Sequence, residues 1–324
     1  MEQALENDLQ LDSMPLPPQE TLLHQIQAEP WIRIDAGDVF LKGMAFDRND
    51  NLLLMAAYPG PVAADKSAAG KVNRSILSIT PNKKITEVIA QQGIRMCDHA
   101  VHKDGRIFIA CLTGELLVAN ADGSDVKPIS SRIEGKPERL SDLTFDSEGY
   151  LYVTDFTGYA GNPTGGVYRW SPDYQVVEPF MTNMTTPNGI AFAPDEKALW
   201  VSCSLANEIV SIPLNEKRES IGKAAILYRL SGPAGGDGIR VDVLGNMYLA
   251  INFQGRVLIF NKHGIPIANV LMPGRDRGEL VRTTNVVFKP GTNEVYVAAS
   301  GEKGGAWVYK FQGLAEGSSL FSHQ

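Results

Sequence analysis

The sequence predicts an all-β fold, a six-bladed β-propeller, and three observations support this. One sequence frame recurs six times. Each copy begins with a polar residue, or with a cysteine in one copy, and continues as a short strand; the clearest copy is Asn188-Gly189-Ile190-Ala191-Phe192. A turn and a second apolar strand follow each copy. The copies begin at 42, 97, 141, 188, 237 and 284, so the steps are 55, 44, 47, 49 and 47 residues. A period of about 40–50 residues with several strands per unit is typical of propeller blades.

Each unit is justified by the same local pattern of alternating apolar residues and turn residues. The Pro194-Asp195-Glu196-Lys197 turn separates the two strands of the fourth copy, and Pro290-Gly291-Thr292-Asn293 does the same in the sixth. The second strands are expected at Asn51 to Met55, Arg106 to Cys111, Tyr150 to Thr154, Ala198 to Ser202, Asn246 to Ile251 and Glu294 to Ala299.

The chain is divided into an N-terminal arm, residues 1–28, and a single propeller, residues 29–324. The arm is expected to be partly disordered or to form a short helix over Glu20 to Ala28, because Pro30 would end a helix there. Trp31 to Ile34 is predicted to be a strand that completes the last blade. The longest step contains residues 59–71, an inserted loop that we expect on the face of the propeller by the channel mouth.

Composition excludes several classes of function. The net charge of −7, without a basic stripe, argues against nucleic-acid binding. No run of 18 apolar residues is present, so no membrane span is expected, and the N-terminus lacks the basic start and apolar stretch of a secretory signal. Three cysteines cannot all pair, and a reducing cytoplasm is the simplest location for such a protein.

The first residue of each frame precedes the strand expected to be innermost in its blade. Six such positions converge on one axis, so they should form a ring at one end of the channel. The ring comprises Lys42, Cys97, Ser141, Asn188, Asp237 and Thr284. Convergent polar groups in a concavity indicate a site for a small-molecule substrate. The alternative is a hydrated channel whose polar groups only satisfy one another.

Several phrases resemble the gluconolactonase/senescence-marker-protein-30 (luciferin-regenerating-enzyme-like) family of six-bladed propellers. They are Pro187-Asn188-Gly189-Ile190-Ala191, Gly236-Asp237-Gly238-Ile239-Arg240 and Ser141-Asp142-Leu143-Thr144-Phe145-Asp146. Thr154-Asp155-Phe156-Thr157-Gly158-Tyr159 and Gly255-Arg256-Val257-Leu258-Ile259-Phe260 are similar to the bacterial drug-responsive lactonase subfamily. The resemblance covers about residues 28 to 318 and implies a hydrolase that opens lactones.

The resemblance also implies a divalent cation, often Ca²⁺, at the channel mouth. Its usual ligands are a glutamate from the first blade, an asparagine from the fourth and an aspartate from the fifth, with an asparagine or aspartate of the third blade nearby. Asn188 and Asp237 match this pattern. Lys42 stands where the family has the glutamate, and Ser141 stands at the third-blade position.

Lys42 leaves two interpretations open, because an ammonium cannot ligate a cation and repels one. In the first, the ammonium occupies the place of the metal, pairs with Asp237 and leaves a site without a metal. In the second, Lys42 extends into solvent, and a weakened metal site survives on Asn188, Asp237 and water.

Cys97 is a further catalytic candidate. A neighbouring lysine would lower the pKa of its thiol, and alternation along a strand would place His99 on the same side, so a Cys/His nucleophile is conceivable. A structural thiol is the alternative. His99, Thr284 and Asp142 are candidates for substrate binding, although the side chain of Asp142 is expected to point away from the ring and to support the loop.

Two functions of different classes remain. The first is a lactone hydrolase in which Asp237 acts as base or positions water, Asn188 and Ser141 orient the substrate, and Lys42 supplies positive charge. The second is a metal-free lyase, cyclase or isomerase with Lys42 and Asp237 as an acid/base pair, or a propeller that only binds a small molecule. A lowered pKa at Lys42 would also permit Schiff-base chemistry.

Overall fold

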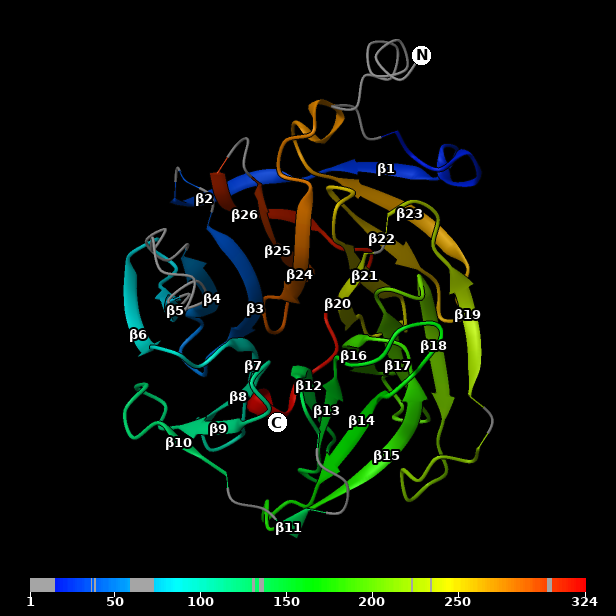
Figure 1. Cartoon of the computed structure of the whole chain (residues 1–324). Helices are drawn as coiled ribbons and strands as arrows, with labels where there is room; N and C mark the ends of the chain where they lie inside the picture. The colour runs from blue at the N-terminus through cyan, green and yellow to red at the C-terminus, as the bar shows by residue number, and fades with distance from the viewer. Residues whose placement is uncertain are drawn as a thin grey trace, which may run out of the picture.

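The computed structural model describes residues 15–35, 37, 39–58, 73–129, 132–133, 137–222, 224–233, 235–301 and 305–324. Six sheets of four or five strands surround one central axis (Figure 1). The predicted six-bladed β-propeller is therefore confirmed. Among the described residues, no helix is long and apolar enough to cross a membrane.

Each blade is an antiparallel meander that runs outward from the axis. The inner strands are β3 (Phe40–Phe46), β7 (Met96–Val101), β12 (Leu140–Phe145), β16 (Pro187–Phe192), β20 (Gly236–Val241) and β24 (Arg282–Phe288). The second strands are β4 (Leu52–Tyr58), β8 (Ile107–Cys111), β13 (Leu151–Asp155), β17 (Ala198–Cys203), β21 (Met247–Ile251) and β25 (Glu294–Gly301). The third strands are β5 (Asn73–Ile79), β9 (Leu116–Ala119), β14 (Gly165–Trp170), β18 (Glu208–Pro213), β22 (Arg256–Phe260) and β26 (Gly305–Gln312).

The outer strands are β6 (Ile85–Gln91), β10 (Lys127–Pro128), β15 (Val176–Met184), β19 (Ala225–Arg229), β23 (Pro266–Leu271) and β2 (Glu29–Asp35). Two blades carry a fifth, parallel strand: β11 (Arg132–Ile133) beside β15, and β1 (His24–Gln27) beside β23. Short 3₁₀ helices occupy Pro18–Glu20 (η1), Arg275–Arg277 (η2) and Phe321–His323 (η3).

The core lies between the blades. Second strands such as β8 and β21 are buried along their whole length, because each is covered by a neighbouring blade on both faces. A strand that is covered on both faces needs apolar side chains at consecutive positions, and the uninterrupted apolar sequences of β8 and β21 supply them. The ring closes where β2 pairs antiparallel with β26 of the last blade, which confirms the strand predicted at Trp31 to Ile34.

The helix predicted over Glu20 to Ala28 is wrong. The segment forms η1 and then β1, which pairs in parallel with β23. The open edge of β23 offers unpaired backbone groups, and these override the local helical preference. Residues 15–28 of the predicted arm are thus packed on the fifth blade, whereas residues 1–14 and the loop at 59–71 lie outside the described residues.

All six inner strands contain a β-bulge at the same place. The register shifts lie between Leu41 and Met44 in β3, between Leu140 and Leu143 in β12, and at equivalent positions in the other four strands. A bulge sets two residues against one on the partner strand and breaks the period-two alternation of side chains. Two consecutive residues of each inner strand are therefore brought toward the channel.

Candidate active site at the channel mouth

The structure brings the six predicted residues together as a ring at the start of the inner strands, here called the mouth ring. It consists of Lys42, Cys97, Ser141, Asn188, Asp237 and Thr284, and each of these residues is at most 5% exposed. Polar groups so buried need partners within the protein. The hydrogen bonds among them therefore define what the ring can do.

Lys42 lies at the centre of these contacts. Its Nζ donates to Asn188 Oδ1 at 3.1 Å and forms an ion pair with the carboxylate of Asp237. The ammonium thus joins the first, fourth and fifth blades. The second interpretation required Lys42 to extend into solvent, but its side chain is buried in the ring.

A chain of hydrogen bonds continues around the ring from Asn188. Ser141 Oγ donates to Asn188 Oδ1 at 2.8 Å, and Cys97 Sγ lies 3.5 Å from Ser141 Oγ. On the other side, Asn188 Nδ2 donates to Ser204 Oγ at 3.0 Å. Since Ser204 accepts from the amide nitrogen, Asn188 must keep its oxygen directed toward Lys42 and Ser141.

Thr284 has a different role from the other five. Its Oγ1 donates to the backbone carbonyl of Leu41 at 2.7 Å, so it ties the sixth blade to the first. It is buried and engaged in this backbone contact. Its prediction as a substrate-binding residue stays untested.

The bulges place a second layer of side chains directly below the mouth ring. This inner layer contains Asp98, Asp142 and Asn285, and glycines occupy the equivalent positions of the other three blades. Asn285 Nδ2 donates to Asp98 Oδ2 at 2.7 Å. A Cβ atom at Gly43 would lie 2.1 Å from Asp98 Oδ1, and one at Gly189 would lie 2.1 Å from the Asp237 carbonyl oxygen. Gly43 therefore leaves room for the carboxylate of Asp98, and Gly189 lets the backbone of the fifth blade come close.

Asp142 points into the channel, contrary to the prediction that it points away. Its Oδ2 accepts the N–H of Ile190 at 3.2 Å and lies 3.7 Å from Nη1 of Arg240. The bulge is the reason, because it turns the residue after Ser141 inward. Asp98, Asn285 and Arg240 were missed by the sequence analysis; for the first two the available signal was that the position after every ring residue holds a glycine, an aspartate or an asparagine.

Burial and charge together set the protonation states at the mouth. Burial alone would lower the pKa of Lys42, but the charge of Asp237, with smaller contributions from Cys97 and Asp98, leaves it above its usual value. Lys42 is therefore an ammonium at neutral pH, and the lowered pKa that Schiff-base chemistry requires is not found. Burial raises the pKa of Asp237, an effect that Lys42 partly opposes.

The predicted activation of Cys97 is also wrong. Burial raises the pKa of its thiol, and the opposing charge of Lys42 does not reverse this. The bulge at Cys97 separates it from His99, which lines a cavity nearer the opposite end of the channel. The structure therefore does not form the Cys97/His99 pair, and the three cysteines of the chain are free and buried.

The position of His99 gives a testable dependence of stability on pH. Burial and the charge of Arg240 lower the pKa of His99 to about 3, whereas an unfolded histidine titrates near pH 6.5. As the pH falls below 6.5, His99 binds a proton in the unfolded chain but stays neutral in the folded chain, so the free energy of unfolding decreases.

The expected loss from this one group is about 2 kcal/mol between pH 7 and pH 5. Urea unfolding of the wild type and of His99→Leu at these two pH values measures it. The variant should lose less stability than the wild type over the interval by about that amount. Equal losses in both proteins would show that His99 is protonated in the folded state.

The mouth ring does not fit a divalent cation as these residues are arranged. The carbonyl oxygen of Asn188 already accepts from Lys42 and Ser141, and the carboxylate of Asp237 is paired with the ammonium. In the part of the chain that the structure describes, no group of three or more His, Cys, Asp or Glu side chains is arranged to hold a metal ion.

Comparison with known proteins decides the family. The sequence model of the protein family described as the SMP-30/Gluconolactonase/LRE-like region matches residues 71–301, well over half of the chain. The chain belongs to the SMP-30/gluconolactonase/LRE-like family. This confirms the resemblance that the motifs around Ser141, Asn188 and Asp237 indicated.

Relatives in the SMP-30/gluconolactonase/LRE-like family match over nearly the whole chain. Lactonase drp35 of Staphylococcus saprophyticus is 38% identical over 316 residues, covering 95% of this chain and 93% of that protein. Lactonase drp35 of Staphylococcus aureus (strain USA300) is 35% identical over 314 residues, covering 94% of this chain and 93% of that protein. Among solved structures, the calcium-binding protein regucalcin from Agrobacterium tumefaciens has a TM-score of 0.71 at 16% identity, covering 93% of this chain and 98% of its own. That likeness supports the fold.

Proposed function

We propose that this protein is a hydrolase that opens a lactone or a related cyclic ester at the mouth ring, with the ammonium of Lys42 in place of a bound cation. Membership of the SMP-30/gluconolactonase/LRE-like family supports the reaction class, since relatives that are 35–38% identical over almost the full length are named lactonases. The contacts of Lys42 support the substitution of the cation.

One observation carries the proposal: Lys42 Nζ binds both Asn188 Oδ1 and the carboxylate of Asp237. These are the two residues that match the cation ligands of the family pattern. An ammonium has three N–H donors, and two are engaged here. The third is free to donate to a substrate oxygen and to stabilise negative charge that develops on it.

The remaining residues of the ring have roles that follow from their contacts. Asp237 has a pKa raised by burial, which favours a carboxylate that accepts a proton from an attacking water. Ser141 and Ser204 hold the amide of Asn188 from two sides, so its orientation is fixed before a substrate arrives. Cys97 is the end of this hydrogen-bond chain and is not the nucleophile.

Calorimetric titration with Ca²⁺, together with lactone hydrolysis with and without a chelator, tests the proposal. The wild type should not bind Ca²⁺ and should hydrolyse a lactone at a rate that the chelator leaves unchanged. Loss of activity on chelation would contradict the role of the ammonium. Failure to hydrolyse any member of a lactone panel would favour the metal-free lyase, cyclase or isomerase alternative.

Two variants of Lys42 make the test specific. Lys42→Glu restores the carboxylate of the family pattern, so it should gain Ca²⁺ binding and lose chelator-insensitive hydrolysis. Lys42→Met is the matched control, since it removes the ammonium without adding a ligand. It should bind no Ca²⁺ and lose about 100-fold or more in kcat, the usual effect of deleting a donor to a developing oxyanion. Equal Ca²⁺ binding by both variants would show that position 42 does not govern the cation.

A further inference from the structure

A large cavity lies at the opposite end of the channel from the mouth ring. Its volume is about 770 Å³, and residues late in the inner strands and in the turns that follow them line it. The inner layer of Asp98, Asp142 and Asn285 separates it from the mouth ring, because those side chains fill the channel between the two ends. We call it the tail-side cavity, since residues 316–324 cover it.

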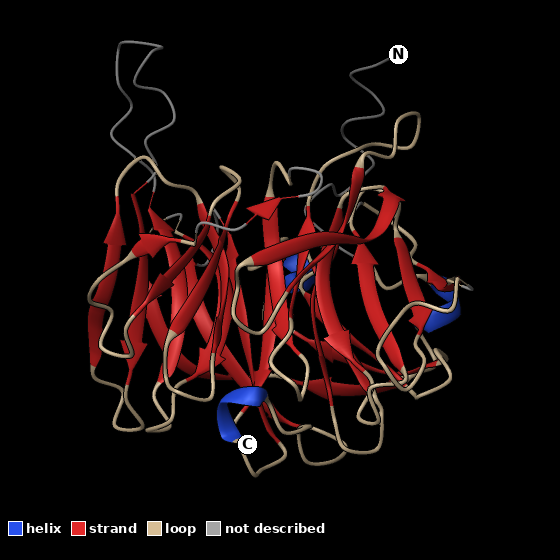
Figure 2. Ribbon diagram, turned by 90° about the horizontal axis from the view of Figure 1, so that it is seen from below, coloured by secondary structure: helices blue, strands red, loops and turns tan. Residues whose placement is uncertain are grey.

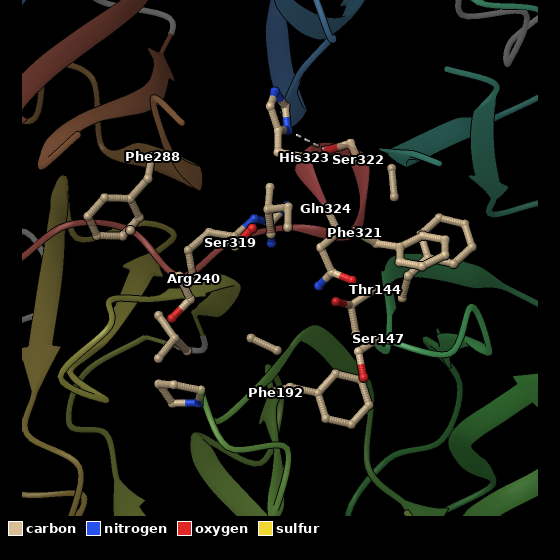
Figure 3. A pocket seen from close by; sticks show the side chains of 18 of the residues that line it. Thr144, Ser147, Phe192, Arg240, Phe288, Ser319, Phe321, Ser322, His323 and Gln324 are labelled. Atoms are coloured by element: carbon tan, nitrogen blue, oxygen red, sulfur yellow. Dashed lines mark hydrogen bonds between the residues drawn. The ribbon is translucent and has the colours of Figure 1, made fainter. Parts of the chain in front are cut away.

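Residues 316–324 form a strap across this end of the channel (Figures 2 and 3). One end is held by backbone hydrogen bonds, from Val243 N to Glu316 O at 2.8 Å and from Ser318 N to Val241 O at 3.0 Å. The other end is held by Phe321, which is 5% exposed and packs against the rings of His102 and Phe145 on the second and third blades. The strap is thus fixed at its two ends.

The inner end of the cavity wall combines apolar side chains with one polar ring. Met44, Leu143 and Ile190 contribute the apolar surface. His99 also lines the cavity and is 1% exposed; the backbone of Leu53 lies near its ring, but neither ring nitrogen is in full hydrogen-bonding geometry with any group in the described part of the chain. A buried imidazole so poorly paired calls for a partner that the protein itself does not supply.

The two arginines that line the cavity, Arg218 and Arg240, each have acidic neighbours. Arg218 at the rim is paired with Glu196 and with Glu148, the latter at 2.9 Å. Arg240 lies 3.7 Å from Asp142, and it donates to the carbonyl oxygen of Ile239 at 2.6 Å. An anionic ligand would meet no unpaired arginine there and would face the carboxylates of Asp195 and Glu316, so its desolvation would be uncompensated, whereas a neutral ligand carries no such cost.

We propose that the tail-side cavity is a second ligand site, which takes a neutral, largely apolar small molecule bearing a hydroxyl or carbonyl oxygen. The oxygen hydrogen-bonds to His99, the apolar body lies against Met44, Leu143 and Ile190, and the strap acts as a lid latched by Phe321. A volume of this size is within the usual range for small-molecule sites. The site is independent of the hydrolysis proposed at the mouth ring.

Fluorescence titration with Nile red, a neutral apolar dye with a carbonyl oxygen, tests the site. The wild type should bind one equivalent saturably. Thr144→Phe places a ring in the cavity and should abolish binding while leaving lactone hydrolysis unchanged (Figure 3). The matched control is Thr86→Phe, on the exposed outer strand β6, which should bind as the wild type does. Binding that survives in Thr144→Phe, or no saturable binding by the wild type, would overturn the proposal.

Four further arms identify the location of the dye, its hydrogen bond to His99, the ligand class and the lid. The double variant Lys42→Met/Asp237→Leu should still bind Nile red; loss of binding there would assign the dye to the mouth ring. His99→Leu should bind about tenfold more weakly, the effect of one lost hydrogen bond.

The anionic dye 8-anilinonaphthalene-1-sulfonate should bind at least tenfold more weakly than Nile red, and the reverse order would overturn the neutral class. Phe321→Ala should release Nile red at least tenfold faster, and an unchanged rate would exclude the lid.

Discussion

Asp237→Asn should lower the free energy of unfolding by about 3–5 kcal/mol, the usual cost of removing one partner of a buried ion pair. Lys42 is 5% exposed and Asp237 is 2% exposed, so the ammonium would be left in the interior without its counter-charge. Under the proposed function, lactone hydrolysis should also fall about 100-fold or more, because the base is lost. Urea unfolding and initial rates with one lactone measure the two effects.

A double variant separates stability from chemistry. In Lys42→Met/Asp237→Leu both charges are replaced by apolar side chains, which often costs nothing in a buried pair. We expect its free energy of unfolding to lie within about 1 kcal/mol of the wild type, with hydrolysis still absent. If Asp237→Asn were as stable as the wild type, the ion pair would not be the element that holds the mouth ring together.

Glu20→Gln should have an effect of similar size on stability, far from the mouth ring. Glu20 and Arg256 are both fully buried and form an ion pair between the N-terminal segment and β22. Glu20 also accepts from Tyr228 Oη at 2.7 Å, and its carbonyl oxygen accepts from Asn269 Nδ2 at 3.0 Å. Without the carboxylate, the buried Arg256 guanidinium loses its counter-charge, so we expect a loss of about 3–5 kcal/mol in urea unfolding.

An exposed ion pair provides the control for Glu20→Gln. Asp125 and Lys127 lie 2.7 Å apart with more than half of each side chain exposed. Asp125→Asn makes the same chemical change, and an asparagine tolerates the positive φ of 55° at that position. The expected change is below about 1 kcal/mol. Similar losses in the two variants would mean that burial of Glu20 adds nothing to its pair with Arg256.

The repeat architecture could be predicted from the sequence because it depends on local pattern. Alternating apolar residues mark the strands, turn residues mark their ends, and the recurrence of the frame gives the number of blades. The strand at Trp31 to Ile34, which closes the last blade, was predicted as well. The six members of the mouth ring followed as well, since equivalent positions in a cyclic repeat must meet around the axis.

The helix predicted at Glu20 to Ala28 shows where local pattern fails. Its sequence does not reveal that the edge of β23 is open to pair with it, or that Glu20 forms an ion pair with Arg256. Both partners are more than 200 residues away in the chain. Such long-range partners decide the conformation of a short segment whose own preference is weak.

By itself, the sequence determined the number of blades, the composition of the mouth ring and the replacement of the family's first-blade glutamate by Lys42. The tertiary structure decided which way side chains point and what charge they carry. The bulges turn Asp98 and Asp142 into the channel and direct His99 away from Cys97, and burial raises the pKa of Cys97 while Asp237 keeps Lys42 an ammonium. The physical reason is that side-chain direction at a bulge and the free energy of a buried charge depend on neighbouring blades, and no single stretch of sequence contains them.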